Sequence, residues 1–178
     1  MPLTFLLGGA RSGKSSLSVR LANEHAGPVV FVATCPRIDG DDDLDRRIER
    51  HRADRPDWPT IEELHDLEGV IAGSRTDEFV IVDCLSLWVY NLMHRGDDAD
   101  DIVCAASSFG RAAAARANPI VVISNEVGMG VHPETEEGRI YRDIIGSVNQ
   151  AVAAHATAAL LMVAGLAIPL RDPAEFLS

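Results

Sequence analysis

The chain has 178 residues, of which 47% are apolar, and it carries a formal net charge of -11. That length suits one domain with a substantial core, and the apolar content excludes a mainly disordered protein. A strongly acidic chain repels nucleic acid, so we expect no nucleic-acid partner. We interpret residues 1–178 as one domain.

Targeting signals and cysteine pairs are missing from the sequence pattern. No apolar run is long enough to cross a bilayer, and the stretch MPLTFLLGGARSGKS has glycines and charges where a signal peptide needs an apolar segment and a cleavage site. We therefore expect a cytoplasmic protein without a membrane span. Cys35, Cys84 and Cys104 form no CxxC pair, which argues against a disulfide framework and against structural zinc.

Short apolar runs rich in β-branched residues alternate with segments of helical composition. The expected strands are 3–7, 29–33, 79–83, 120–124 and 159–163, and the expected helices are 14–25, 42–53, 64–73, 85–95, 100–117 and 136–155. Continuous apolarity is typical of strands that are buried on both faces. The alternation predicts an α/β fold with a mostly parallel central sheet and helices on both faces, and the tail GLAIPLRDP predicts a short C-terminal hairpin.

A phosphate-binding motif follows the first expected strand. GGARSGKS, residues 8–15, fits G-x-x-x-x-G-K-[ST] and precedes a helical segment, which is the context that gives this motif meaning. The glycines let backbone N–H groups surround phosphate oxygens, and the next helix adds its positive N-terminal end. Lys14 would neutralise β/γ-phosphate charge and Ser15 would bind Mg²⁺. The motif predicts a P-loop NTPase-like fold. The alternative is a glycine-rich turn that only caps a helix.

Asp83 ends the expected strand FVIVD. P-loop proteins keep a carboxylate at the end of a neighbouring strand to hold Mg²⁺ or its water shell. Given the motif at 8–15, we predict that Asp83 reaches the metal directly or through water. The alternative is a helix N-cap.

The stretch RRIERHRADRP, residues 46–56, places one histidine among five arginines. Leu44, Ile48 and His51 fall at i, i+4 and i+7 of a helix, so the histidine shares the inward face. A neutral imidazole near phosphate can act as a nucleophile, and neighbouring arginines can stabilise charge on a displaced pyrophosphate. A well-charged surface helix with a half-buried histidine is the alternative that the residues leave open.

A glycine-rich loop, SNEVGMG, begins at residue 124 after the expected strand 120–124. Open α/β sheets bind ligands at the carboxyl ends of their strands. Glu126 in this loop is therefore a candidate to orient a Mg²⁺-bound water or to contact a substrate side chain. A plain turn is the alternative.

Several stretches together resemble the bifunctional adenosylcobinamide kinase and adenosylcobinamide-phosphate guanylyltransferase family of cobalamin biosynthesis. They cover about residues 3–171 and are GGARSGKS, VATC, RRIERHRADRPDWPTIEE, VDCLSLWVYNLM, SNEVGMGVHPE, GRIYRDIIGSVNQAVAAHA and MVAGLAIPLR. The combined RI-x-x-H and W-x-T-x-E spacing and the SNEVGMG loop are the most specific of these. VATCPRIDGDD, with Cys35 and Pro36, departs from the family pattern.

The resemblance implies a kinase that phosphorylates adenosylcobinamide with ATP or GTP, and a guanylyltransferase that then transfers GMP from GTP to give adenosylcobinamide-GDP. It implies His51 as the nucleophile that carries GMP, Lys14 as the second catalytic residue, Mg²⁺ as cofactor and a homotrimeric assembly. The implied nucleotide-binding residues are Gly8, Gly9, Ala10, Arg11, Ser12, Gly13, Lys14, Ser15, Ala33, Thr34, Cys35, Arg52, Ala53, Asp54, Arg55, Glu62 and Asp83.

Two other functions use the same motif. The first is a P-loop kinase for another small alcohol or nucleotide, in which His51 only packs or binds phosphate. The second is a nucleotide-driven switch or motor subunit, which the short chain disfavours because no further partner-binding domain is evident. Label transfer from GTP to the protein distinguishes the resembling family from both.

Overall fold

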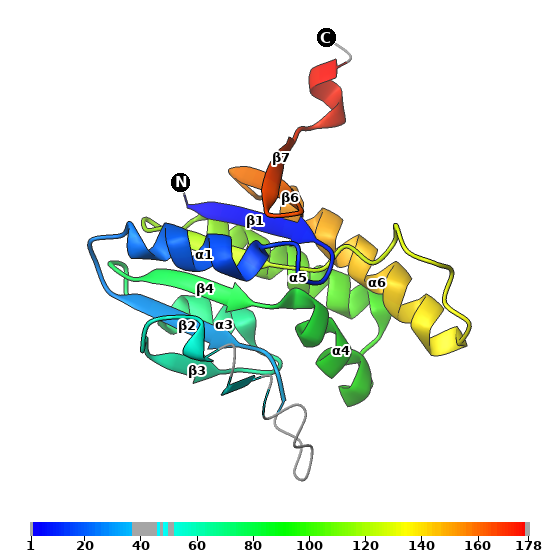
Figure 1. The fold of residues 1–178 in the computed structure, drawn as a ribbon. Coiled ribbons are helices and arrows are strands. Elements are labelled where there is room, and N and C mark those ends of the chain that lie inside the picture. The colour runs from blue at the N-terminus through cyan, green and yellow to red at the C-terminus, as the bar shows by residue number, and fades with distance from the viewer. Residues whose placement is uncertain (1, 37–45, 47, 50–51, 177–178) are drawn as a thin grey trace.

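The computed structural model describes residues 2–36, 46, 48–49 and 52–176. Within them, seven strands form one sheet in the order β3-β2-β4-β5-β1-β6-β7 (Figure 1). Neighbouring strands are parallel except for the antiparallel pair β6 and β7. The predicted mostly parallel sheet with a C-terminal hairpin is therefore confirmed. The strands are β1 Leu3–Gly8, β2 Val29–Ala33, β3 Thr60–Glu62, β4 Phe79–Asp83, β5 Ile120–Ile123, β6 Ala158–Val163 and β7 Leu166–Leu170.

The helices connect the parallel strands, as the alternating sequence pattern predicts. They are α1 Lys14–Asn23, α3 Leu67–Gly73, α4 Leu85–Arg95, α5 Ala99–Ala114 and α6 Glu136–Ala153, followed by a 3₁₀ turn at Pro173–Phe176. The predicted helix 42–53 lies largely outside the described residues, although those described within it are helical: Arg46, Ile48, Glu49, Arg52 and Ala53. Among the described residues, no helix is both long and apolar enough to span a bilayer.

The sheet has a core on each face because alternate strand residues point to opposite sides. Leu3, Phe5 and Leu7 of β1 join the larger core, which α3, α4, α5 and α6 cover. Leu6 joins a smaller core together with Leu17 and other residues of α1. Figure 1 shows α1 apart from the helices that cover the opposite face. The layers thus match the predicted helices on both faces, with most helices on one of them.

Three elements differ clearly from the sequence prediction, and one of them, α5, ends at Ala114 rather than at residue 117. Strand β3 was not predicted, because it is a three-residue edge strand, TIE, in which Ile61 is exposed and which therefore carries no apolar run. Helix α3 begins at Leu67 rather than at residue 64. Asp66 caps it by accepting a hydrogen bond from Gly69 N, at 2.8 Å, and an Asp at this position marks a helix start.

The register of the sheet brings several predicted site residues into one row. Glu62 pairs with Ala33, Ala33 with Asp83, and Asp83 with Ile123. These residues end β3, β2, β4 and β5, so the row runs along the carboxyl edge of the parallel strands. Gly8 ends β1 at the same edge, where open α/β sheets bind their ligands.

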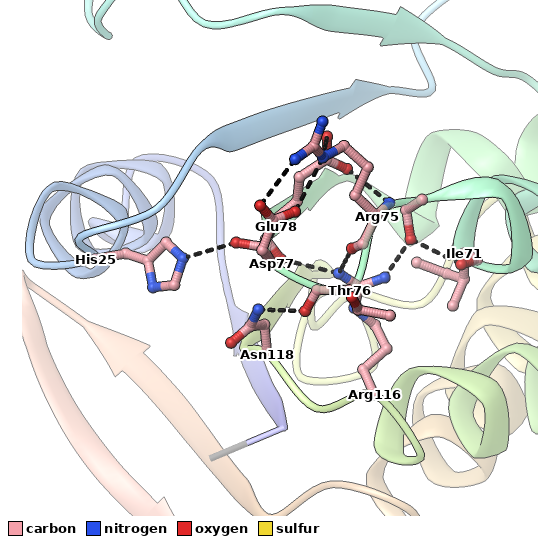
Figure 2. A network of polar contacts seen from close by, with 9 residues as sticks. His25, Ile71, Arg75, Thr76, Asp77, Glu78, Arg116 and Asn118 are labelled. Atoms are coloured by element: carbon pink, nitrogen blue, oxygen red, sulfur yellow. Dashed lines mark hydrogen bonds and ion pairs between the residues drawn. The ribbon is translucent and has the colours of Figure 1, made fainter.

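The opposite edge of the sheet is closed by a polar network between the segments before β4 and β5 (Figure 2). Arg116 donates to the carbonyl oxygens of Arg75 and Glu78, at 3.2 and 2.8 Å, and also to the Ser74 hydroxyl. Asn118 donates to the carbonyl oxygen of Thr76. Burial lowers the pKa of the Arg116 guanidinium, since a half-buried cation loses hydration. The network ties two loops that no backbone ladder joins.

Replacing Arg116 with methionine keeps an unbranched side chain but removes every donor. Hydrogen bonds from charged groups contribute more than neutral ones, so we expect Arg116→Met to lower the free energy of unfolding by about 2 kcal/mol. Arg111→Met is the matched control, because Arg111 is exposed on α5 and donates only to Ser108. Urea unfolding of the two variants measures the difference, and equal stabilities would show that the network contributes nothing.

Candidate functional site

The loop between β1 and α1, residues 9–13, lies at the carboxyl edge of the sheet. Gly13 precedes the first helical residue with φ 102°, a left-handed conformation in which a side chain is strained. Arg11 also has positive φ, at 56°. Ser12 N donates to Gly9 O at 3.3 Å. This backbone path leads directly into the N-terminus of α1, which favours an anion.

Lys14 lies inside this loop with only 6% of its surface exposed. Its ammonium donates to the carbonyl oxygens of Gly8 and Gly9, both at 2.7 Å, and to Ser12 Oγ at 3.4 Å. Burial lowers the pKa of Lys14, whereas the neighbouring Cys84 and Asp83 oppose that shift. The buried cation is therefore held by carbonyl dipoles, and a phosphate oxygen is a stronger, charge-assisted partner for it.

Ser15 and Asp83 come from different elements and meet beside the loop. Ser15 Oγ donates to Asp83 Oδ2 at 3.3 Å. A hydroxyl and a carboxylate are hard oxygen ligands, and Mg²⁺ typically uses one or two such protein groups together with phosphate oxygens and waters. The pair fits a magnesium site of this kind. In the described part of the chain, His, Cys, Asp and Glu residues form no group of three or more that is suited to hold a metal by itself.

The turn between β6 and β7 packs directly against the phosphate loop. Gly165 N donates to Ser12 O at 3.0 Å. A Cβ on Gly13 would lie 3.2 Å from Gly165 Cα, and one on Gly8 would lie 2.4 Å from Met162 O. Backbone thus approaches backbone where no side chain fits. The sequence analysis predicted the hairpin but not its contact with the phosphate loop, because no local pattern indicates which distant segment a turn will meet.

Thr34 follows β2 but turns its side chain toward protein backbone. Its hydroxyl accepts from Cys84 N at 2.8 Å and donates to Cys84 O at 2.7 Å, and the residue is fully buried. Asn91 Nδ2 donates to Thr34 O at 2.8 Å. Burial raises the pKa of the Cys84 thiol to about 11, so this thiol stays protonated at neutral pH. In this structure Thr34 therefore fixes the chain that follows Asp83.

The other residues at the exit of β2, the segment at the carboxyl end of this strand, lie near carboxylates. Cys35 is half-buried, and burial together with the carboxylates of Asp83 and Glu62 raises the pKa of its thiol. Ala33 is also half-buried and stands between Glu62 and Asp83 in the register row. The structure thus brings the predicted residues 33–35, Glu62 and Asp83 together.

Two arginines of the 46–56 segment, Arg52 and Arg55, line an open depression of about 550 Å³ together with residues 56–60. Arg52 lies 3.9 Å from a carboxylate oxygen of Glu62. Arg55 stacks over the Phe31 ring at 4.0 Å and donates to Thr60 Oγ1 at 2.9 Å. Burial, and next the charge of Arg52, lower the pKa of Arg55. The two guanidinium groups outnumber the one carboxylate of the lining, Asp57, so the depression has a net positive charge that suits an anionic ligand.

Not every predicted residue takes part in that geometry. Ala53 and Asp54 are exposed. His51 and Leu44 lie outside the described residues, so the predicted inward face of the histidine stays a prediction. Gly9, Ala10 and Arg11 form the exposed rim of the phosphate loop.

The loop that follows β5 also reaches the phosphate loop. Glu126 N donates to Gly8 O at 3.2 Å, and the Glu126 carboxylate accepts from Gly128 N at 2.6 Å. Ser124 donates to Asn149 Oδ1 of α6 at 2.6 Å. The sequence analysis singled out the loop that begins at Ser124 but did not connect it with Asn149, because a polar residue on a helix indicates a contact only once its neighbours are known.

Comparison with known proteins identifies relatives of the whole chain. Residues 4–170 match the family model described as cobinamide kinase / cobinamide phosphate guanyltransferase. Two bifunctional adenosylcobalamin biosynthesis proteins are similar: CobP of Pseudomonas aeruginosa, with 38% identity over 93% of this chain and 95% of the relative, and CobU of Escherichia coli, with 34% identity over 95% and 99%. The resemblance inferred from the sequence is confirmed.

Solved structures with the same fold are far more distant in sequence. A protein of Pyrococcus horikoshii has a TM-score of 0.57 at 10% identity, covering 97% of this chain and 87% of that one. An ATPase of a bacterial type III secretion system has a TM-score of 0.52 at 10% identity, covering 94% and 56%. These likenesses concern the fold, and they agree with the predicted P-loop NTPase-like class.

The Ser15–Asp83 pair leads to a prediction about metal dependence. Asp83→Asn keeps the volume of the side chain and removes its charge, so we expect nucleotide binding to require at least about tenfold more Mg²⁺. Binding of a fluorescent nucleoside triphosphate, titrated with Mg²⁺, measures the shift. Asp100→Asn, at an exposed position of α5, is the control. An unchanged titration in Asp83→Asn would leave Asp83 a structural residue.

Proposed function

The chain belongs to the cobinamide kinase / cobinamide phosphate guanyltransferase family, and from that membership we propose that it carries out both reactions in cobalamin biosynthesis. It first phosphorylates the hydroxyl of adenosylcobinamide with ATP or GTP. It then transfers GMP from GTP to the new phosphate, giving adenosylcobinamide-GDP. The bifunctional names and the nearly complete coverage of the relatives support this proposal.

The kinase step is supported by the meeting of Lys14, Ser15 and Asp83 at one edge of the sheet. This is the observation that carries the proposal. The acceptor oxygen attacks the γ-phosphorus, a new P–O bond forms, and the bond to the β-phosphate oxygen breaks to release the nucleoside diphosphate. Lys14 exchanges the Gly8 and Gly9 carbonyls for phosphate oxygens and stabilises their charge.

Ser15 and Asp83 would hold Mg²⁺, which would supply positive charge to neutralise the phosphates. The N–H groups of the loop and the N-terminus of α1 orient the triphosphate. Gly8 to Ser15 bind phosphate, and Ala33, Thr34, Cys35 and Glu62 border the nucleotide. Thr34 does so through the backbone that it fixes.

For the guanylyl step we assign His51 as the nucleophile. Its imidazole nitrogen attacks the α-phosphorus of GTP, a P–N bond forms, and the P–O bond to pyrophosphate breaks. The phosphate oxygen of cobinamide phosphate then attacks the same phosphorus and the P–N bond breaks. Arg52 and Arg55 border a cationic depression in which developing pyrophosphate charge is stabilised, and Ala53 and Asp54 connect them.

Two variants separate the reactions. His51→Ala removes the proposed nucleophile, so incubation with α-labelled GTP and Mg²⁺ should leave no label on the protein, while cobinamide phosphorylation continues. Lys14→Ala should lower the rate of phosphorylation at least about a hundredfold, because the ammonium that stabilises the charge of the transferring phosphate is lost. In wild type the label should be acid-labile and base-stable, as expected for a phosphoramidate. Its uptake should fall at acidic pH, where protonation removes the attacking form of histidine.

The same experiment tests the alternative kinase without a covalent intermediate. Cobinamide phosphorylation with no label on wild type would leave only the kinase half of the proposal. Label that survives in His51→Ala would assign the nucleophile to another residue.

We further propose a homotrimer, as the family resemblance implies. Exposed apolar side chains on β7 support association, since this strand is the edge of the sheet and Leu166, Ile168 and Leu170 recur at alternate positions. Monomers seldom leave such a contiguous patch exposed on an edge strand.

Sedimentation equilibrium at micromolar concentration should give three times the mass of one chain. Ile168→Asp, which places a charge on the apolar face of β7, should shift the equilibrium toward monomer. Ala115→Asp adds the same charge at an exposed position after α5 and should leave the trimer intact. A monomeric wild type contradicts the assembly without affecting the proposed reactions.

A further inference from the structure

Buried polar side chains gather beneath the exits of β4 and β5. Ser86, Ser124 and Asn149 are each at most 6% exposed. Asn149 accepts from the Ser124 hydroxyl at 2.6 Å and donates to Asn125 O at 3.2 Å. Asn125 Nδ2 donates to Ser86 Oγ at 2.9 Å. Buried polar groups are costly unless they are paired, so this network holds the two exits in one arrangement.

The network ends at Glu126, next to the phosphate loop. Glu126 N donates to Gly8 O, the carbonyl oxygen that also accepts from the Lys14 ammonium. The exit of β5 is thus within hydrogen-bond distance of the atom that holds the phosphate-binding cation. Glu126 is half-buried, and its carboxylate accepts a hydrogen bond from Gly128 N of its own loop.

Sheet order adds an independent observation. β5 lies between β4, which ends in Asp83, and β1, which leads into the phosphate loop. The loop that follows β5 and carries Glu126 therefore lies, in the order of the strands, between Asp83 and the phosphate loop. An alcohol that attacks the terminal phosphate must release a proton there, and kinases commonly use a carboxylate to accept it.

We propose that Glu126 is a catalytic residue that accepts the proton of the acceptor hydroxyl in the kinase reaction; this rests on the proposed function. As the acceptor oxygen bonds to the γ-phosphorus and the nucleoside diphosphate leaves, the hydroxyl proton moves to the Glu126 carboxylate and then to water. Asn149 is a positioning residue that acts through Glu126. It holds the Ser124 hydroxyl and the Asn125 carbonyl oxygen, directly before Glu126 in the chain.

The kinase reaction requires a group that accepts a proton, whereas guanylyl transfer does not. The guanylyl acceptor is a phosphate monoester, whose second ionisation lies near pH 6, so at pH 8 it is already a dianion without a proton to lose. The histidine that attacks GTP uses a neutral nitrogen lone pair. Neither half of guanylyl transfer therefore requires Glu126.

The test uses the full-length protein with Glu126→Gln, which retains a carbonyl oxygen to accept from Gly128 N but accepts no proton. We expect kcat for cobinamide phosphorylation to fall about a hundredfold, with an unchanged KM for the nucleotide. Labelling by α-labelled GTP, and GMP transfer to supplied cobinamide phosphate, should stay at the wild-type level. Glu136→Gln, which removes a charge from the exposed first turn of α6, should change neither reaction.

Asn149→Ala tests the positioning role. We expect it to lower kcat for the kinase in the wild-type background and to have no further effect in Glu126→Gln, because a residue that acts only through Glu126 is non-additive with it. Gln150→Ala, at the neighbouring exposed position of α6, is the control. Additive losses would leave Asn149 a structural residue only.

Three results overturn the assignment of Glu126. A wild-type kcat in Glu126→Gln shows that the carboxylate accepts no proton. An equal loss of both reactions shows a role in loop structure instead. Failure of wild type to phosphorylate cobinamide overturns the proposed function, and with it this inference, whereas either of the first two results leaves the function standing.

Discussion

The carbonyl oxygen of Gly8 is the point at which the site is joined together. It accepts from the Lys14 ammonium at 2.7 Å and from Glu126 N at 3.2 Å. Gly8 is also the last residue of β1, whose side chains are all buried. The phosphate loop, the exit of β5 and strand β1 therefore meet at one backbone group. Because Gly8 admits no side chain beside Met162 O, the hairpin adds a fourth element to this junction.

Positive charge gathers at the site although the chain as a whole is acidic. The formal net charge is -11, yet Lys14 is buried at the phosphate loop, and Arg52 and Arg55 border the depression beside Glu62. Local fields of this kind attract a small anion even when the whole surface is negative. Burial lowers the pKa of both Lys14 and Arg55, which records the cost of keeping cations partly out of water. An anionic ligand offsets that cost, because it gives the partly buried cations a partner of opposite charge.

Polar contacts join β4 and β5 at both ends of these parallel strands. At the amino edge, Arg116 and Asn118 join the loops before β4 and β5 through backbone carbonyls (Figure 2). At the carboxyl edge, Asn149 holds the segment after β5, and Asn125 links that segment to Ser86 after β4. Fixing β4 and β5 at both ends limits their relative movement, and a stable spacing between Asp83 and the phosphate loop is what phosphoryl transfer requires.

The sequence by itself determined the parallel strands, the phosphate loop with Lys14 and Ser15, the carboxylate at Asp83 and the family, because each depends on local apolar runs or on spacing within one segment. The sequence analysis did not predict strand β3, because an exposed edge strand has no apolar run. It placed the start of α3 too early, because the Asp66 cap, and not helical composition, sets where the helix begins. Only the tertiary structure decided that Gly165 closes on the phosphate loop, that Thr34 holds Cys84, and that Asn149 reaches the exit of β5. These contacts join residues far apart in the chain, and no local pattern encodes which distant backbone group a buried polar side chain will meet.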